Sequence, residues 1–304
     1  MSGQAQRRLS PLRIPRIPSQ PPTPDAPVGV FDSGVGGLTV LRELLRELPD
    51  ERYVYFGDTG NCPYGVRSEA EITQLSLNGA TFLLERGAKL IVVACNTASS
   101  AAIHTLRATY PQVKFIAVVP AVKPAAEMTR VGRVAVAATN AAARSDYLRG
   151  LIRQFAQGVE VYPVGCQSLV TLAEAGQLDG PEVEREIRRS IEPLLAKGID
   201  VLSLGCTHFP AMRPVFERVV GPSVRVIDSG AAVARQTRRV LTQQGLLTML
   251  DTGPADEPRT PRSDDEFWRS GENTSFEQVA SLLLGAPVEA RYAADMLWPP
   301  ASAV

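Results

Sequence analysis

The chain has 304 residues, enough for one large or two medium domains with a sizeable core. Its formal net charge is zero and its pI is about 6.8, so the overall charge does not favour nucleic acid or an anionic membrane as a partner. Hydrophobic residues make up 44% and charged residues 21%, as in ordinary globular proteins, and no apolar run approaches the roughly 18 residues of a membrane span.

Residues 1–27 form a proline- and arginine-rich start to the chain. They contain seven prolines, four arginines and a single acidic residue, Asp25. This composition predicts a disordered extension, because so little apolar surface can be buried. A transit peptide is the alternative, but the prolines at 11, 15 and 18 oppose the amphipathic helix that such peptides form. These residues contain no continuous apolar segment of the kind that forms a secretory signal. We therefore expect a cytoplasmic protein with free thiols.

From residue 28 onward, short apolar runs alternate with amphipathic segments. Alternation at this spacing is typical of a parallel sheet covered by helices on both faces. The first pass predicts strands at 28–31, 53–56, 90–94 and 113–119, and helices at 38–48, 69–86 and 98–109.

The same pattern then restarts. The second pass predicts strands at 134–137, 159–163, 201–204 and 224–227, and helices at 144–157, 168–175, 181–197, 210–220 and 231–244. The triplet Asp-Ser-Gly at 32–34 reappears at 228–230. This repetition indicates two similar α/β units that arose from an old duplication.

The end of the chain completes the domain organisation. A loop rich in Pro, Asp, Thr and Arg is predicted at 250–265, followed by a short strand at 267–268 and a helix at 275–284. We expect a first domain of residues 28–121 plus about 229–292, a second domain of residues 122–228, and a frayed tail at 293–304. The predicted fold class is α/β, with two mainly parallel sheets covered by helices and an active site in the cleft between the units.

Two of the four cysteines, Cys95 and Cys206, occupy matching positions in the two units. Each follows a predicted buried strand, at the edge of a parallel sheet where ligands bind, and each precedes small polar residues that open a helix. The positive end of a helix favours a thiolate, so we expect the pKa of these thiols to fall below the usual value of about 8.5. If the units face each other, the pair suits removal of a proton from one face of a carbon and its return to the other. The alternative is two buried and inert cysteines.

Further polar residues gather at the same predicted sheet edges. Asp32 ends the first strand, where it can bind an ammonium group or assist proton transfer, or simply cap a helix. His208, two residues after Cys206, can exchange a proton with that thiol, or can be a structural histidine at a helix start. Hydroxyl, amide and backbone N–H groups at helix N-termini can bind carboxylates, and here they come from Asn96, Thr97 and Thr207. The alternative is that these residues only cap the helices.

The remaining candidates carry weaker signals. The turn at 63–65 presents Tyr64 either to a ligand or to solvent. Cys62, in a Gly/Asn/Pro loop, and Cys166 are assigned no catalytic role, and His104 lies in the body of a predicted helix. No CxxC, HExxH or other metal-ligand spacing occurs, so we predict no metal. A nucleotide-dependent enzyme would require a phosphate-binding loop, which the sequence lacks, and we predict no cofactor.

Six motifs follow one another along the chain: GVFDSGVGGLTV at 29–40, YFGDT at 55–59, PYG at 63–65, VACNTAS at 93–99, LGCTHFP at 204–210 and VIDS at 226–229. Together they resemble the motifs of glutamate racemases, in the cofactor-independent aspartate/glutamate racemase superfamily, and the resemblance spans about residues 28–292.

The resemblance implies racemisation of glutamate without a cofactor. One thiolate removes the α-proton while the opposite thiol protonates the other face, with Cys95 the base for D-glutamate and Cys206 the base for L-glutamate. Asp32 and His208 would assist proton transfer, and the implied substrate-binding residues are Asp32, Ser33, Tyr64, Gly65, Asn96, Thr97, Glu174, Thr207 and His208. The product D-glutamate would feed peptidoglycan synthesis, and hence cell-wall biogenesis and cell shape. The expected partner is a small molecule, with neither nucleic acid nor membrane, and a homodimer is compatible with the sequence.

Three segments depart from the family pattern. Ala138-Thr139-Asn140 stands where a Gly-Thr opening is expected, Gln167 follows Cys166 where proline is frequent, and Gly60-Asn61-Cys62 replaces an Ala-Arg pair. A racemase for aspartate or hydantoin would keep both thiols but change the carboxylate-binding neighbours. A binding module that has lost catalysis would incorporate no deuterium at the α-carbon in heavy water.

Overall fold

The computed structural model describes residues 21–250, 252–272 and 275–293. The disorder expected of residues 1–20 and the fraying expected of 294–304 lie outside the described residues. Residues 21–27 contain a turn in which the Ala26 N–H donates to the Thr23 carbonyl, and Lys89 Nζ donates to the Pro24 carbonyl. These residues therefore differ from the disorder expected of them. None of the described helices is long and apolar enough to cross a membrane.

The first sheet has six strands in the order β10-β9-β2-β1-β3-β4, and every neighbouring pair is parallel. The strands are β1 (Val28–Asp32), β2 (Tyr53–Gly57), β3 (Leu90–Val93), β4 (Phe115–Ala117), β9 (Glu266–Arg269) and β10 (Arg291–Tyr292). Residues of β1, β2 and β3 are buried throughout, because helices cover both faces of the sheet.

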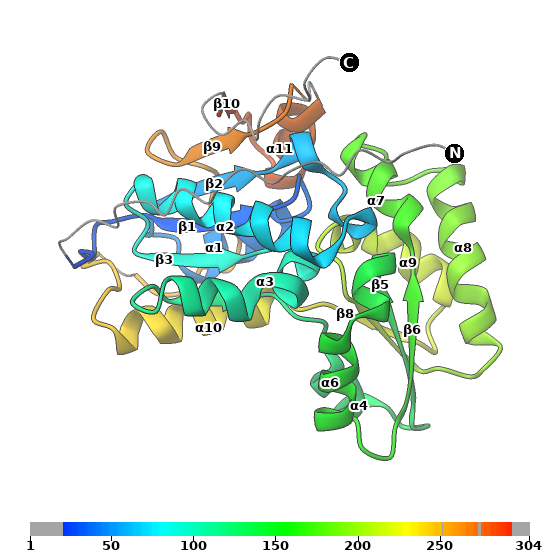
Figure 1. Ribbon diagram of the computed structural model, residues 1–304. Coiled ribbons are helices and arrows are strands. Elements are labelled where there is room, and N and C mark those ends of the chain that lie inside the picture. Colours follow the sequence, from blue (N-terminus) through cyan, green and yellow to red (C-terminus); the bar gives the residue numbers. More distant parts are fainter. Residues whose placement is uncertain (1–20, 251, 273–274, 294–304) are drawn as a thin grey trace, which may run out of the picture.

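Helices cover the two faces of this sheet (Figure 1), and a separate apolar core lies on each face. One core is formed with α1 (Leu38–Glu47), α10 (Gly230–Gln243) and α11 (Ser275–Leu284). The other is formed with α2 (Glu69–Glu85) and α3 (Asn96–Thr109). The start of α2 is fixed by a capping box, in which Ser68 and Glu71 bond each other's backbone N–H groups.

The second sheet has four parallel strands in the order β6-β5-β7-β8. The strands are β5 (Arg133–Ala138), β6 (Glu160–Gly165), β7 (Val201–Leu204) and β8 (Arg225–Ile227). One face packs against α7 (Gln167–Glu174), α8 (Pro181–Leu195) and α9 (Arg213–Val220), and the other against α4 (Val122–Met128) and α6 (Asp146–Phe155). The predicted α/β class, with mainly parallel sheets covered by helices, is confirmed.

Several predicted elements differ in detail from the structure. The helix expected at 144–157 is two helices, α5 (Asn140–Arg144) and α6, because Ser145 ends the first and caps the second by accepting the Leu148 N–H at 3.1 Å. The helix expected at 210–220 begins as a 3₁₀-helix, η3 (Phe209–Met212), before α9. The sequence pattern also missed α4, which contains Pro124, and the two-residue strand β10.

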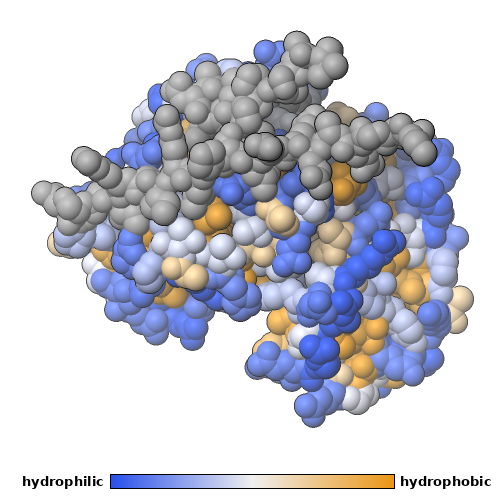
Figure 2. All heavy atoms as spheres, viewed as in Figure 1, coloured by the Kyte–Doolittle hydropathy of each residue, from blue (hydrophilic) through white to orange (hydrophobic). Residues whose placement is uncertain are grey.

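The chain passes between the two sheets twice, from β4 to α4 and from β8 to α10 (Figure 1). Figure 2 shows a notch in the surface between the two parts of the molecule. Because β1, β3, β5 and β7 are all parallel within their sheets, the segments that follow them emerge at the carboxyl edge of each sheet.

Candidate active site

The two predicted thiols lie at the carboxyl edges of the two sheets. Cys95 comes two residues after β3, and Cys206 comes two residues after β7. Each is 5% exposed. Cys95 Sγ donates to Ser33 Oγ, and the hydroxyl of Thr207, the residue after Cys206, donates to Asp32, the residue before Ser33. The structure therefore brings both thiols to one buried polar region.

The Cys95 thiol is held at the start of α3. Its sulfur accepts the Ala98 N–H at 3.5 Å and donates to Ser33 Oγ at 3.5 Å. We expected the helix terminus to lower the pKa of this thiol, and that expectation is wrong for the free protein. Burial, followed by the charge of Asp32, raises the pKa of Cys95 to about 12, and these two effects outweigh the opposing hydrogen bonds with Ser33 and Ala98.

The Cys206 thiol has a different neighbour. His208 Nδ1 lies 3.6 Å from Cys206 Sγ, and His208 Nε2 lies 2.6 Å from Glu174 Oε1. Burial alone would lower the pKa of His208, but the hydrogen bonds to Cys206 and Glu174 hold it well above 6.5. The expected α-helix start directly after Cys206 is also wrong, because η3 intervenes and α9 begins only at Arg213. A histidine, and not a helix terminus, is the main polar partner of this thiol.

Asp32 connects the loop after β1 with the segment that contains Cys206. Its side chain is fully buried, with Oδ1 accepting the Gly34 N–H at 2.7 Å and Oδ2 accepting the Thr207 hydroxyl at 3.3 Å. Burial raises the pKa of Asp32 to about 6, although the charge of His208 opposes the shift. The carboxylate is therefore poised to change its charge near neutral pH.

The glycine-rich loop after β1 lies directly against this site. A side chain at Gly34 would collide with the Glu174 carboxylate, and one at Gly36 would collide with the His208 ring. The Val35 N–H donates to Glu174 Oε1 at 2.9 Å. These glycines allow the first unit to approach the Glu174–His208 pair of the second unit, and they do not form a phosphate-binding loop.

The turn at 63–65 lies at the edge of the same region. Tyr64 is 1% exposed, and its hydroxyl donates to Asp58 Oδ2 at 2.6 Å. A side chain at Gly65 would meet Gln167 and Thr139. Thr139 was not predicted as a site residue, yet its hydroxyl lies 2.9 Å from that of Thr97 and joins α3 to the second unit. The Ala-Thr-Asn departure at 138–140 was the signal that could have directed attention to it.

A cavity of about 320 Å³, at the small end of the range for ligand pockets, opens beside Cys206. Its lining includes Asn96, Thr207 and Ser229. Asn96 is 5% exposed, and its Nδ2 is buried with no hydrogen-bond partner among the described residues. Cys95 is not among the described residues that line this cavity, so the cavity reaches only one of the two thiols.

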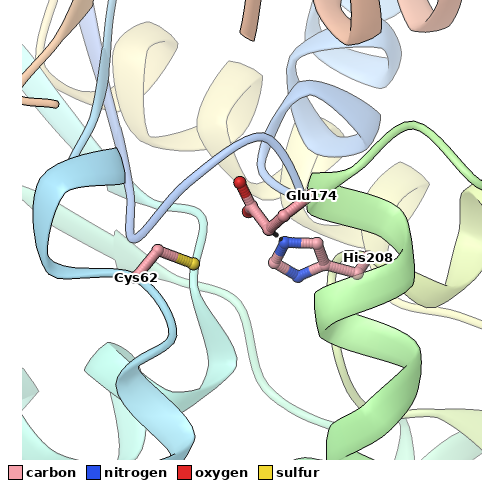
Figure 3. Close-up of side chains that lie close together, drawn as sticks. All are labelled: Cys62, Glu174 and His208. Carbon is pink, nitrogen blue, oxygen red and sulfur yellow. Dashed lines mark hydrogen bonds and ion pairs between the residues drawn. The ribbon is translucent and has the colours of Figure 1, made fainter. Parts of the chain in front are cut away.

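One group of potential metal ligands also lies here. Cys62, Glu174 and His208 place a thiol, a carboxylate and an imidazole within 4.8 Å of one another (Figure 3). We predicted no catalytic role for Cys62, and no sequence pattern indicated that its thiol would lie beside Glu174, where the structure has it. Neither the loop sequence nor any motif spacing could reveal this, because the three residues come from three distant segments.

Comparison with known proteins is consistent with this architecture. Residues 29–237 match the family described as Asp/Glu/Hydantoin racemase. Glutamate racemase from Pseudomonas aeruginosa (strain UCBPP-PA14) is 45% identical over 262 residues, which are 86% of this chain and 95% of that relative. Glutamate racemase from Herpetosiphon aurantiacus is 44% identical over 259 residues, covering 85% and 98% of the two chains.

Solved structures show the same fold. Glutamate racemase from Francisella tularensis in complex with D-glutamate has a TM-score of 0.75 at 28% identity, covering 88% of this chain and 96% of the other. The Escherichia coli glutamate racemase, solved with L-glutamate and the activator UDP-MurNAc-ala, has a TM-score of 0.74 at 33% identity, with 88% and 97% covered.

The fold and these matches define the class of the protein, which is an amino-acid racemase and hence an isomerase. The chain belongs to the Asp/Glu/Hydantoin racemase family, and the resemblance to glutamate racemases inferred from its motifs is confirmed.

Proposed function

We propose that this protein interconverts L- and D-glutamate by a two-base proton transfer between Cys95 and Cys206, without a cofactor. The observation that carries the proposal is the placement of two buried thiols in one polar region: Cys95 contacts Ser33, and Thr207, next to Cys206, contacts Asp32, next to Ser33. The 45% identity to curated glutamate racemases supports glutamate as the substrate. An aspartate or hydantoin racemase remains the alternative substrate class.

The two thiols have unequal starting states in this proposal. The raised pKa keeps Cys95 protonated at neutral pH, so it is the donor when L-glutamate is the substrate. Cys206 is then the base, and protonated His208 donates a hydrogen bond to its thiolate. Cys206 takes the α-proton from one face of the carbon, and Cys95 delivers its proton to the opposite face. For D-glutamate the two sulfurs exchange roles.

Substrate binding makes the transfer feasible. The α-proton of an amino acid is weakly acidic, so the carbanion requires oriented dipoles in a site that excludes water. We propose that Asp32 binds the substrate ammonium, because its carboxylate is buried between the Cys95 side and the Cys206 side of the site. Neutralising Asp32 in this way also weakens the charge that holds the Cys95 proton. The proposed contacts to the carboxylates come from Ser33, Tyr64, Gly65, Asn96, Thr97 and Thr207.

The unpaired amide of Asn96 is the best supported of these contacts, because a buried donor without a partner is costly unless a ligand satisfies it. The hydroxyl of Tyr64 is already bonded to Asp58, so its role is to shape the turn at 63–65. Glu174 acts through His208, as a positioning residue.

The wider role follows from the product. We propose a cytoplasmic enzyme whose D-glutamate supplies peptidoglycan synthesis, cell-wall biogenesis and cell shape. We also propose that residues 28–121 with 229–292, and residues 122–228, are the two domains that close around the substrate. Closure would bring the cavity beside Cys206 into continuity with Cys95.

The test is an assay of the full chain with both enantiomers of glutamate and of aspartate, in heavy water. We expect turnover of glutamate, with one solvent deuterium at the α-carbon of each product molecule. Turnover of aspartate with glutamate inert would overturn the substrate. No deuterium incorporation with any of the four compounds would indicate a binding module instead of an enzyme.

A further inference from the structure

Cys62, Glu174 and His208 converge from three segments beside the thiol of Cys206. Cys62 follows the 3₁₀-helix η1 (Thr59–Asn61), Glu174 is the last residue of α7, and His208 precedes η3. Their ligand atoms lie within 4.8 Å of one another. Figure 3 shows the Cys62 sulfur directed toward the His208 ring and the Glu174 carboxylate. The mechanism proposed above has no use for Cys62.

The three side chains are the donors that a zinc ion takes in proteins. A thiolate, an imidazole nitrogen and a carboxylate oxygen in one cluster suit Zn²⁺ and similar borderline or soft divalent cations. Ca²⁺ and Mg²⁺ prefer oxygen ligands and gain little from the sulfur or the nitrogen. The donor types of the cluster therefore favour Zn²⁺ and similar cations over Ca²⁺ and Mg²⁺.

The cluster also has unused binding capacity. Glu174 Oε2 is buried and has no hydrogen-bond partner among the described residues, while Oε1 accepts from both Val35 N–H and His208. The backbone N–H fixes the carboxylate, and the Cys206 sulfur at Nδ1 fixes the orientation of the imidazole ring. Outer contacts of this kind orient metal ligands and strengthen binding. Cys62 and Glu174 are partly buried, and His208 is buried.

We propose that Cys62, Glu174 and His208 form an inhibitory site for a thiophilic divalent cation such as Zn²⁺. The cation binds the Cys62 sulfur, a Glu174 oxygen and His208 Nε2, and leaves a fourth position to water. The protons of the Cys62 thiol and of His208 Nε2 are released to solvent.

The consequence is that His208 is held by the cation instead of by Glu174. The cation takes His208 Nε2 as a ligand and displaces the 2.6 Å contact between that nitrogen and Glu174 Oε1. Because His208 Nδ1 lies 3.6 Å from Cys206 Sγ, racemisation then lacks the normal hydrogen-bond partner of Cys206. The inhibitory effect rests on the function proposed above, whereas the binding of the cation does not.

The site is tested by titrating the full chain with Co²⁺, which reports thiolate coordination by a sulfur-to-cobalt charge-transfer absorption. We compare the unmodified chain, Cys62→Ser and Cys166→Ser. Cys166 is a buried thiol outside the cluster, so its variant controls for loss of a cysteine elsewhere. We expect the absorption to appear in the unmodified chain and in Cys166→Ser. It should be lost, with affinity weakened by at least about tenfold, in Cys62→Ser, because even outer contacts of metal sites are worth that much.

The same three proteins are then assayed for racemisation with and without added Zn²⁺. Zn²⁺ should inhibit the unmodified chain and Cys166→Ser, EDTA should reverse the inhibition, and Cys62→Ser should keep normal turnover in the presence of Zn²⁺. Equal cobalt absorption in Cys62→Ser would overturn the site, because the metal would then be held by Cys95 or Cys206. Cobalt binding that depends on Cys62 in a chain inert toward glutamate would support the site and contradict only the proposed function.

Discussion

The two thiol sites occupy the same position in the two sheets but differ in their surroundings. Cys95 caps α3 and contacts Ser33, and its pKa is raised to about 12. Cys206 precedes a 3₁₀-helix and contacts His208, which is itself bonded to Glu174. Burial therefore favours the protonated thiol at Cys95, while an imidazole lies beside the sulfur of Cys206.

This difference shows that a helix terminus alone does not decide the state of a buried cysteine. At Cys95 the N–H of Ala98 points at the sulfur, as the dipole argument requires, yet burial and the charge of Asp32 outweigh it. A reaction that must run in both directions benefits from such inequality, since one sulfur must be protonated when the other is not.

The largest expected effect is loss of either thiol. Cys95→Ser and Cys206→Ser should each lower racemisation by about 10²- to 10⁴-fold, the range for removal of a general acid or base. Both changes are nearly isosteric, so thermal unfolding should remain close to that of the unmodified chain. Near-normal turnover by either variant in a polarimetric assay would refute a mechanism that needs both sulfurs.

A smaller loss is expected from His208, which acts on one side of the comparison. His208→Gln should lower kcat/KM by about tenfold to a hundredfold, because charge-assisted hydrogen bonds contribute roughly 1.5–3 kcal/mol. The loss must be equal in both directions, since the enantiomers have the same free energy. His104→Gln, on the exposed side of α3, is the matched control and should retain full activity. Equal losses of kcat/KM in His208→Gln and His104→Gln would show that His208 does not assist Cys206.

Asp32 gives a pH dependence with a defined sign. Its raised pKa of about 6 means that the carboxylate becomes protonated as the pH falls through that value. We expect kcat/KM to fall by about tenfold per pH unit below this point, as for an essential ionised group. The measurement is the pH profile of kcat/KM, taken at substrate concentrations well below KM, which reports the ionisation of the free enzyme. If the fall of kcat/KM at low pH persists unchanged in Asp32→Asn, the group that becomes protonated is another residue.

The smallest effect is on stability, and it runs opposite to activity. Between pH 3.8 and about 6 folded Asp32 holds its proton more tightly than the unfolded chain does, so its contribution to stability is lost as the pH rises through this window. Asp32→Asn should therefore raise the free energy of unfolding near neutral pH by about 1–3 kcal/mol, from a displacement of roughly two pKa units. Denaturant unfolding at pH 4 and pH 8 checks it. A variant less stable than the unmodified chain at pH 8 would contradict a buried, costly charge.

The sequence predicted the fold class well, because strands such as β3 are short apolar runs and α11 has the bounds that its periodicity indicated. Local chemistry was harder to predict. The break at Ser145 depends on a single capping contact, and the 3₁₀ start at Phe209 is a local variation at a helix end; apolar periodicity records neither. The high pKa of Cys95 depends on burial and on Asp32, which lies 63 positions earlier in the chain.

The proximity of Cys62 to His208 was also beyond the sequence. A loop cysteine carries no periodic signal, and its neighbours are set by how the glycine-rich loop of one unit meets α7 of the other. Asn96 and Thr207, by contrast, line the cavity beside Cys206, and their places after buried strands indicated this sheet edge, because the carboxyl edge of a parallel sheet collects the segments that follow its strands.

The most direct test of the two-base account is α-proton exchange in heavy water, followed by NMR for each enantiomer of glutamate. The unmodified chain should exchange both enantiomers, Cys206→Ser only D-glutamate and Cys95→Ser only L-glutamate, with neither variant producing the opposite enantiomer at a normal rate. Exchange of both enantiomers by either single variant would contradict the account, because one sulfur would then serve both faces of the carbon.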